Sequence, residues 1–157
     1  MKTDGKWRMA CWVLCVGLML LTLAGCSPGG IPEKVFEQKA AQAGFEVVDI
    51  TEEYSEQSGS EVVKKVLGFY EDPINVQWFE FDSEANAEYF YEGNIGLVES
   101  NATYLMMGTK VSGTDSQYTV IADGSYVLLK RIGTTVVCAR TSMEDSTRLD
   151  NFIESLG

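Results

Sequence analysis

Carboxylates are the most abundant side chains in this sequence that could take part in catalysis or metal binding. The 157 residues include 23 Asp or Glu and no histidine. Without histidine the chain lacks the usual general base, the commonest metal ligand and any Ser-His or Cys-His pair. Glu80 and Asp82 alternate along a predicted strand, which would suit a glycosidase pair, but neither has a recognisable partner environment. We therefore expect an exposed strand residue and a helix cap at these positions, no catalytic residue, and no enzyme.

Glu52, Glu53 and Glu56 lie close enough in sequence to chelate calcium. They lack the Asp-x-Asp-x-Asp-Gly pattern and the twelfth-position acid of a calcium loop, so we expect solvated surface. Gly-rich phosphate loops, Gly-x-Ser-x-Gly and Ser-x-x-Lys are also missing, which predicts no metal site and no cofactor. The formal net charge of -11 argues against nucleic acid as a partner.

The first residues have the pattern of a targeting segment. Lys2, Lys6 and Arg8 form a cationic start, and residues 9–23 are uncharged and apolar. A run of this length fits the hydrophobic region of a signal peptide and is shorter than the roughly 20 residues that span a bilayer.

The sequence Leu23-Ala24-Gly25-Cys26 follows at once and resembles the bacterial lipobox. The resemblance implies cleavage between Gly25 and Cys26 and transfer of a diacylglycerol to the Cys26 thiol. Residues 1–25 would then be a signal peptide and residues 26–31 a lipidated tether, anchored at the extracytoplasmic face of the cell membrane. An ordinary secretory signal cut near Ala24 and an uncleaved anchor are the alternatives.

Removal of residues 1–25 leaves nine basic and 22 acidic residues, a net charge of -13. Anionic lipid headgroups repel such a surface, so we expect the domain to stand off the membrane. Cys138 is then the one cysteine without an assigned role, and its apolar neighbours predict a buried packing residue.

Residues 32–157 are predicted to form a single α+β domain. Helical spacing and caps indicate helices that begin at Pro32, after Asp82-Ser83, and at Ser142, with Gly44 ending the first one. Alternating β-branched and aromatic residues indicate strands, which we expect at residues 45–50, 62–70, 74–82, 118–122, 125–131 and 134–140. We expect loops at residues 51–60 and 99–117, with residues 104–107 the ambiguous segment that an edge strand would also fit.

These elements predict an antiparallel sheet of about six strands with three helices on one face. The two halves look alike, since each reads helix, strand, strand, strand. An internal α-β-β-β repeat and a coincidence are both consistent with the low identity between the halves.

The mature chain resembles a group of small uncharacterised lipoproteins of Gram-positive bacteria. The similarity rests on four motifs: Gly44-Phe45-Glu46-Val47-Val48-Asp49-Ile50-Thr51, Asp82-Ser83-Glu84-Ala85-Asn86-Ala87, Tyr118-Thr119 and Arg131-Ile132-Gly133-Thr134-Thr135. This resemblance implies a lipid-anchored extracytoplasmic domain and carries no activity with it. The segment Tyr104 to Met107 departs from the group, where the middle region is Ser-rich.

Aromatic residues crowd the first hairpin and the helix after it. If helices cover one sheet face, the other would expose some of these rings to a peptide, a glycan or a partner protein, and Tyr70, Trp78 and Phe81 are the candidates. An aromatic core is the simpler alternative. Met106-Met107 has the same two interpretations, packing or an adaptable contact patch.

We accordingly expect a lipid-anchored binding or accessory module without a catalytic site. Its partners would be the membrane, through acyl chains on Cys26, and an envelope protein or peptide. A cell-envelope enzyme that uses a carboxylate pair is the first alternative, and an inhibitor or immunity-type lipoprotein is the second.

Overall fold

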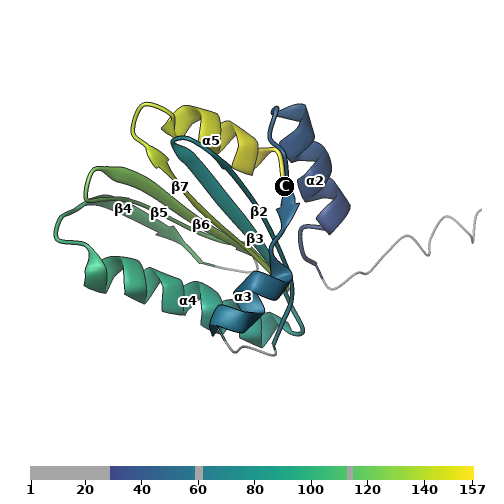
Figure 1. The fold of residues 1–157 in the computed structure, drawn as a ribbon. Coiled ribbons are helices and arrows are strands. Elements are labelled where there is room, and N and C mark those ends of the chain that lie inside the picture. Colours follow the sequence, from purple (N-terminus) through teal and green to yellow (C-terminus); the bar gives the residue numbers. More distant parts are fainter. Residues whose placement is uncertain (1–28, 59–61, 113–114) are drawn as a thin grey trace, which may run out of the picture.

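The computed structural model describes residues 29–58, 62–112 and 115–157. Within them seven strands form one antiparallel sheet in the order β1-β2-β3-β7-β6-β5-β4 (Figure 1). The strands are β1 (Val48–Asp49), β2 (Val63–Glu71), β3 (Ile74–Phe81), β4 (Leu105–Val111), β5 (Asp115–Ala122), β6 (Ser125–Ile132) and β7 (Thr135–Ser142).

Four helices cover the two faces of this sheet. Helices α2 (Glu33–Gln42) and α5 (Ser146–Glu154) lie on one side, and α3 (Thr51–Ser58) and α4 (Glu84–Asn101) on the other (Figure 1). We call these sides the α2/α5 face and the α3/α4 face. The predicted α+β class with an antiparallel sheet is confirmed. The counts differ, with seven strands where about six were expected and four helices where three were expected, and the helices cover two faces instead of one.

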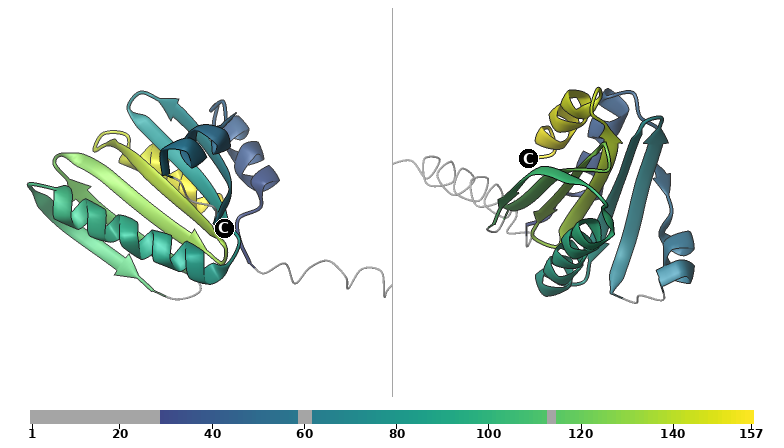
Figure 2. Two further views of the ribbon diagram at one scale, coloured as in Figure 1. Left: turned by 60° about the horizontal axis from the view of Figure 1, so that its bottom comes forward. Right: turned by 90° about the vertical axis from the view of Figure 1, so that its left-hand side faces the viewer.

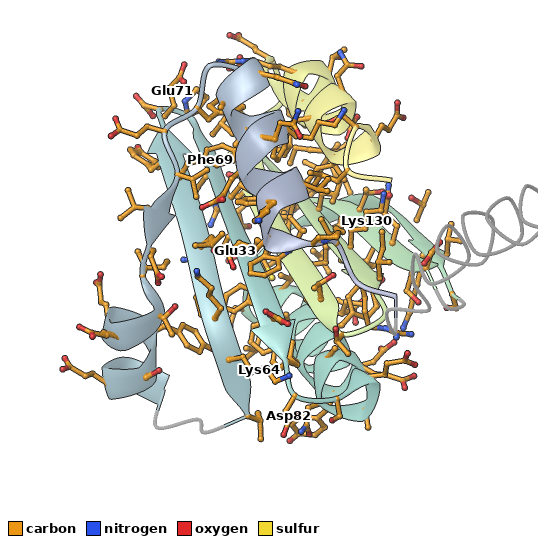
Figure 3. The ribbon with its side chains drawn as sticks, turned by 90° about the vertical axis from the view of Figure 1, so that its right-hand side faces the viewer. Glu33, Lys64, Phe69, Glu71, Asp82 and Lys130 are labelled. Atoms are coloured by element: carbon orange, nitrogen blue, oxygen red, sulfur yellow. The ribbon has the colours of Figure 1, made fainter. Side chains whose placement is uncertain are left out.

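Both faces carry a hydrophobic core because the strands are apolar on both sides. The α2/α5 face buries Phe36, Phe69, Trp78 and Phe152 with their neighbours, and Figure 3 shows Phe69 between the sheet and α2. The α3/α4 face buries Val66, Phe79, Phe81 and others beneath Tyr91 and Ile95 of α4. A sheet with two apolar faces needs helices on both, which is why the one-sided prediction fails.

Three helix ends can be compared with the sequence-based predictions, and two of them lie where the capping residues predicted. The α2 helix ends in a Schellman motif, with Gly44 at φ +87°, its N–H bonded to Ala41 O (3.1 Å) and Phe45 N–H to Ala40 O (2.9 Å). Helix α4 begins where predicted, but Ser83 is its cap and accepts the Asn86 N–H, while Asp82 accepts from the Asn86 side-chain amide. The α5 prediction is wrong by three residues, because Ser142 ends β7 and bonds Asp145 instead.

Two segments predicted as loops are regular elements. Residues 51–58 form α3, where the Tyr54 ring packs on Phe79 at a centroid distance of 5.2 Å. Asp49 accepts both the N–H and the hydroxyl of Thr51 and orders the start of that helix. The ambiguous segment around residues 104–107 lies at the start of β4, which pairs with β5 at the edge of the sheet.

Strands β1-β2-β3 and β5-β6-β7 are placed symmetrically about the β3–β7 pair, as an internal repeat would require, and β4 is an additional strand at one edge. A two-fold rotation that exchanges these antiparallel neighbours would leave equivalent helices on the same face. Helix α4 follows β3 and α5 follows β7, yet they lie on opposite faces (Figure 1). The two halves are therefore not related by a rotation of the sheet, and the repeat is not supported.

The chain before α2 belongs to the domain from Ile31 onward. The Ile31 side chain is 2% exposed, its N–H donates to Thr135 Oγ1 (2.8 Å) and its carbonyl accepts from Trp78 Nε1 (3.1 Å). The predicted tether of residues 26–31 thus extends too far, because Ile31 is fixed in the core.

Candidate functional site

The sequence-based binding residues have different environments. Trp78 and Phe81 are each 1% exposed, whereas Tyr70 is 69% exposed. Gly25 and Cys26, the predicted cleavage and lipidation residues, lie outside the described residues. Only Tyr70 among the three predicted rings is available to a partner.

The burial of Trp78 and Phe81 has a direct structural cause. The Trp78 ring stacks near Phe36 of α2, with centroids 6.0 Å apart. Phe81 lies on the opposite face, 5.0 Å from the Phe90 ring of α4. The predicted exposed aromatic face is therefore wrong, because helices cover both sides of β3.

An open region remains at one end of the α3/α4 face, where neither helix reaches. It forms a hollow of about 450 Å³. We call it the Tyr70 shelf and define it by Glu46, Val48, Gly68, Tyr70, Asn75 and Gln77. It lies on β1, β2 and β3, which Figure 2 shows as the sheet edge farthest from β4.

The strand register brings the shelf residues onto one face. Tyr70 lies opposite Asn75, and Asn75 lies opposite Arg140 of β7. Gly68 lies between Val48 and Gln77 in the next row. A Cβ at Gly68 would meet Ile50 Cδ1 at 3.2 Å and the Val76 carbonyl oxygen at 3.4 Å. The absence of a side chain at Gly68 therefore leaves room for the hollow at this point of β2.

The burial pattern of β3 explains why this end is open. Residues Ile74 to Gln77 alternate between buried and more exposed side chains, and those of Trp78 and Phe79 are buried on opposite faces. Helix α4 therefore covers the second half of the strand and leaves Asn75 and Gln77 accessible.

The shelf combines one aromatic ring with neutral amides and a few charges near its rim. Tyr70 donates its hydroxyl to Asp72 (3.3 Å), and the negative charge of that carboxylate raises the Tyr70 pKa. Tyr70 therefore stays protonated at neutral pH. Arg140 donates to Ser125 Oγ at 2.9 Å. The ring and the amides suit a neutral ligand with hydrogen-bonding groups.

The candidate carboxylates have ordinary surroundings. Asp82 accepts a hydrogen bond from the Asn86 amide (2.6 Å), which lowers its pKa. Glu52 and Glu53 are exposed in the first turn of α3, and the exposed Glu56 follows in the same helix. Residues 29–58, 62–112 and 115–157 contain no group of three acidic, histidine or cysteine side chains placed to hold a metal.

Cys138 lies on β7 between Gln77 and Leu129. Burial raises its thiol pKa to about 12, which keeps the sulfur protonated and unreactive at neutral pH. This agrees with the sequence-based interpretation of a packing residue.

Sequence reasoning missed most of the shelf. Asn75 and Gln77 carry a detectable signal, because they alternate with the apolar Ile74, Val76 and Trp78. Gly68 inside a strand is a second signal, since such a glycine often marks a close approach. Neither signal indicates which face the helices leave open.

The fold and the shelf together define an α+β domain with helices on both faces of its sheet and an open polar and aromatic hollow at one edge. No family model matches the chain, and searches of curated proteins and of solved structures find no match. Among the residues that the structure describes, no helix has the length and apolar character needed to cross a bilayer.

Proposed function

We propose that this protein is a lipid-anchored binding module that displays the Tyr70 shelf to ligands outside the cell membrane. The observation that carries the binding function is the shelf itself, an open hollow with an exposed ring beside neutral amides. The lipobox-like sequence before Cys26 supports the anchor and the location.

The position of Ile31 supports an outward orientation of the shelf. Ile31 bonds Thr135 at the beginning of β7, while Arg140, five residues further along, lies beside the shelf strand β3. Five residues of an antiparallel strand span about 17 Å. An anchor just before Ile31 would hold the β6–β7 turn near the membrane and direct the shelf away from it.

The chemistry of the shelf favours an uncharged peptide or glycan of the cell envelope. A tyrosine ring supplies contact area at little entropic cost, and its hydroxyl adds a polar group. The side-chain amides of Asn75 and Gln77 can each donate and accept hydrogen bonds. They can therefore pair with ligand groups that do both, such as hydroxyl groups or peptide bonds. The strongly acidic surface would disfavour polyanionic ligands.

Capture by Tyr70 is testable with defined envelope material. The full chain in neutral detergent would be mixed with purified peptidoglycan or, separately, with solubilised envelope proteins. Tyr70→Ala should weaken capture by about 2 kcal/mol, the size expected of a central aromatic contact. Quantitative pull-down at several protein concentrations measures the change.

Tyr89→Ala is the matched control, because Tyr89 is 83% exposed on α4 and lies outside the shelf. Thermal melts of both variants should stay close to that of the wild type. Equal capture by Tyr70→Ala and Tyr89→Ala would contradict the proposal that the shelf binds the ligand.

A further inference from the structure

The β4 edge of the sheet is much longer than the β1 edge, although a register shift between Met106 and Thr109 interrupts its pairing with β5. At the other end of the sheet, β1 has two residues and leads directly into α3. In contrast, β4 has seven residues and pairs only with β5 in the sheet order (Figure 2). A terminal strand of this length presents outward main-chain N–H and C=O groups that can pair with another strand.

Exposed apolar side chains gather at this edge. Of the ten large apolar side chains that are exposed in the described residues, six lie on α4, on β4 or directly before β4. Four of them accompany the strand itself: Tyr104, Leu105, Met106 and Val111. Such a concentration is typical of an interaction surface.

Helix α4 adds a row of negative charge beside the strand. Its four charged residues are all Glu. At 100° per residue, Glu88, Glu92 and Glu99 fall within about 40° of one another around the helix. Glu92 bonds Lys110 of β4 (2.7 Å), and Glu99 accepts from Tyr118, the β5 residue opposite Lys110. These contacts place the row along the β4–β5 edge.

We propose that β4 accepts an extended basic segment of another protein, which adds to the sheet as a further strand. Main-chain hydrogen bonds to β4 would supply affinity. Alternate side chains of the added strand point to the α3/α4 face, where Lys or Arg would meet Glu88 and Glu99, since Glu92 is already paired with Lys110. The intervening side chains would contact Met106 and Val111 on the other face.

Charge argues against a second copy of this chain as the occupant. Antiparallel pairing of β4 with its own copy creates a two-fold axis perpendicular to the sheet. Both α4 helices would then lie on the same face of the combined sheet. Their two rows of glutamates would face each other across the β4–β4 contact and repel. The net charge of -11 on each copy adds to this repulsion.

The test uses the full chain in neutral detergent and a fluorescent peptide, Lys-Val-Lys-Thr-Lys-Val-Lys-Thr. Fluorescence anisotropy measures its dissociation constant. A peptide of the same composition with its lysines in one block, and an alternating peptide N-methylated at every amide so that neither of its edges can donate, serve as probes of register and main-chain pairing. We expect both to bind at least about tenfold more weakly. The N-methylated peptide loses several main-chain hydrogen bonds, and the block peptide points only some of its lysines to the glutamate face.

Glu88→Gln/Glu99→Gln tests the acidic row while leaving the Lys110–Glu92 pair in place. We expect this variant to weaken binding of the alternating peptide at least about threefold, with unchanged thermal melts. Glu52→Gln/Glu56→Gln on α3, at the opposite edge, should leave the dissociation constant unchanged. Amide NMR shifts confined to β4 and its neighbours would support the added strand.

Three outcomes would overturn the proposal. The first is no binding of the alternating peptide by the wild type. The second is equal binding of the N-methylated peptide, which would indicate nonspecific charge attraction. The third is a dimer in sedimentation experiments that the peptide cannot dissociate and that buries β4, which would make a second copy the occupant.

Discussion

The indole of Trp78 connects three parts of the domain. Its Nε1 donates to the carbonyl of Ile31, and its ring lies beside Phe36 of α2. Ile31 in turn bonds Thr135 at the start of β7. One side chain thus joins the beginning of the described chain to a helix and to the centre of the sheet.

Trp78→Phe should lower the free energy of unfolding by about 1–3 kcal/mol, because the buried Ile31 carbonyl loses its donor. Trp78→Ala should cost about 3–5 kcal/mol, since it also opens a cavity. Urea unfolding followed by circular dichroism measures both. Tyr70→Ala, at an exposed position of the neighbouring strand β2, should lower the free energy of unfolding by about 0.5 kcal/mol or less. A similar urea midpoint for Trp78→Ala and Tyr70→Ala would contradict the core role of the indole.

At the scale of single elements, α5 has the clearest sequence pattern, and its Phe152 packs among three other rings. Leu149, Phe152 and Ile153 are buried, as the helical spacing predicts. The Phe152 ring lies 5.9, 5.8 and 5.3 Å from the rings of Phe36, Phe45 and Phe69, respectively. This cluster joins α5 to α2 and to the sheet.

Phe152→Ala should therefore reduce stability by about 3–5 kcal/mol, through lost apolar burial and the cavity that remains. Asn151→Ala, at the neighbouring exposed position of α5, is the matched control and should leave stability nearly unchanged. Thermal and urea unfolding of both variants measure the difference. A melting temperature of Phe152→Ala within a degree of the wild type would show that the ring contributes little.

At the scale of the whole molecule, the two edges of the sheet differ in what they offer. The β1–β3 side presents the Tyr70 shelf with its neutral amides, and the β4 side presents an apolar edge beside a row of glutamates. The chain joins the domain beside the β6–β7 turn, at the opposite end of β7 from Arg140. Under the proposed anchor, both edges remain accessible from outside the membrane.

Lipid attachment would then be set by a single thiol. Cys26→Ser should abolish incorporation of labelled palmitate in a bacterial host and leave an unprocessed precursor. Two acyl chains, at about 0.8 kcal/mol per buried methylene, would contribute on the order of 20 kcal/mol to membrane binding. Cys138→Ser should retain the label, because Cys138 is a partly buried residue of β7 that packs against the core of the domain. Unchanged palmitate incorporation in Cys26→Ser would contradict the lipoprotein hypothesis.

The amino-acid sequence was sufficient for features that depend on neighbouring residues. The Asp123-Gly124 turn, the positive φ of Gly44 and the Ser83 cap each arise within a few residues of chain. Strand alternation and the apolar face of α5 are equally local. The α+β class and most element boundaries were predictable for this reason.

Only the tertiary structure decided which faces the helices cover, and therefore which residues a ligand can reach. Trp78 and Phe79 point to opposite faces and are both apolar, so no local pattern distinguishes the buried side from an open one. Residues 51–58 become helical where Tyr54 packs on Phe79, and residues 105–111 become a strand where they pair with β5. These segments have weak intrinsic preferences, and contacts with residues distant in sequence determine their conformation.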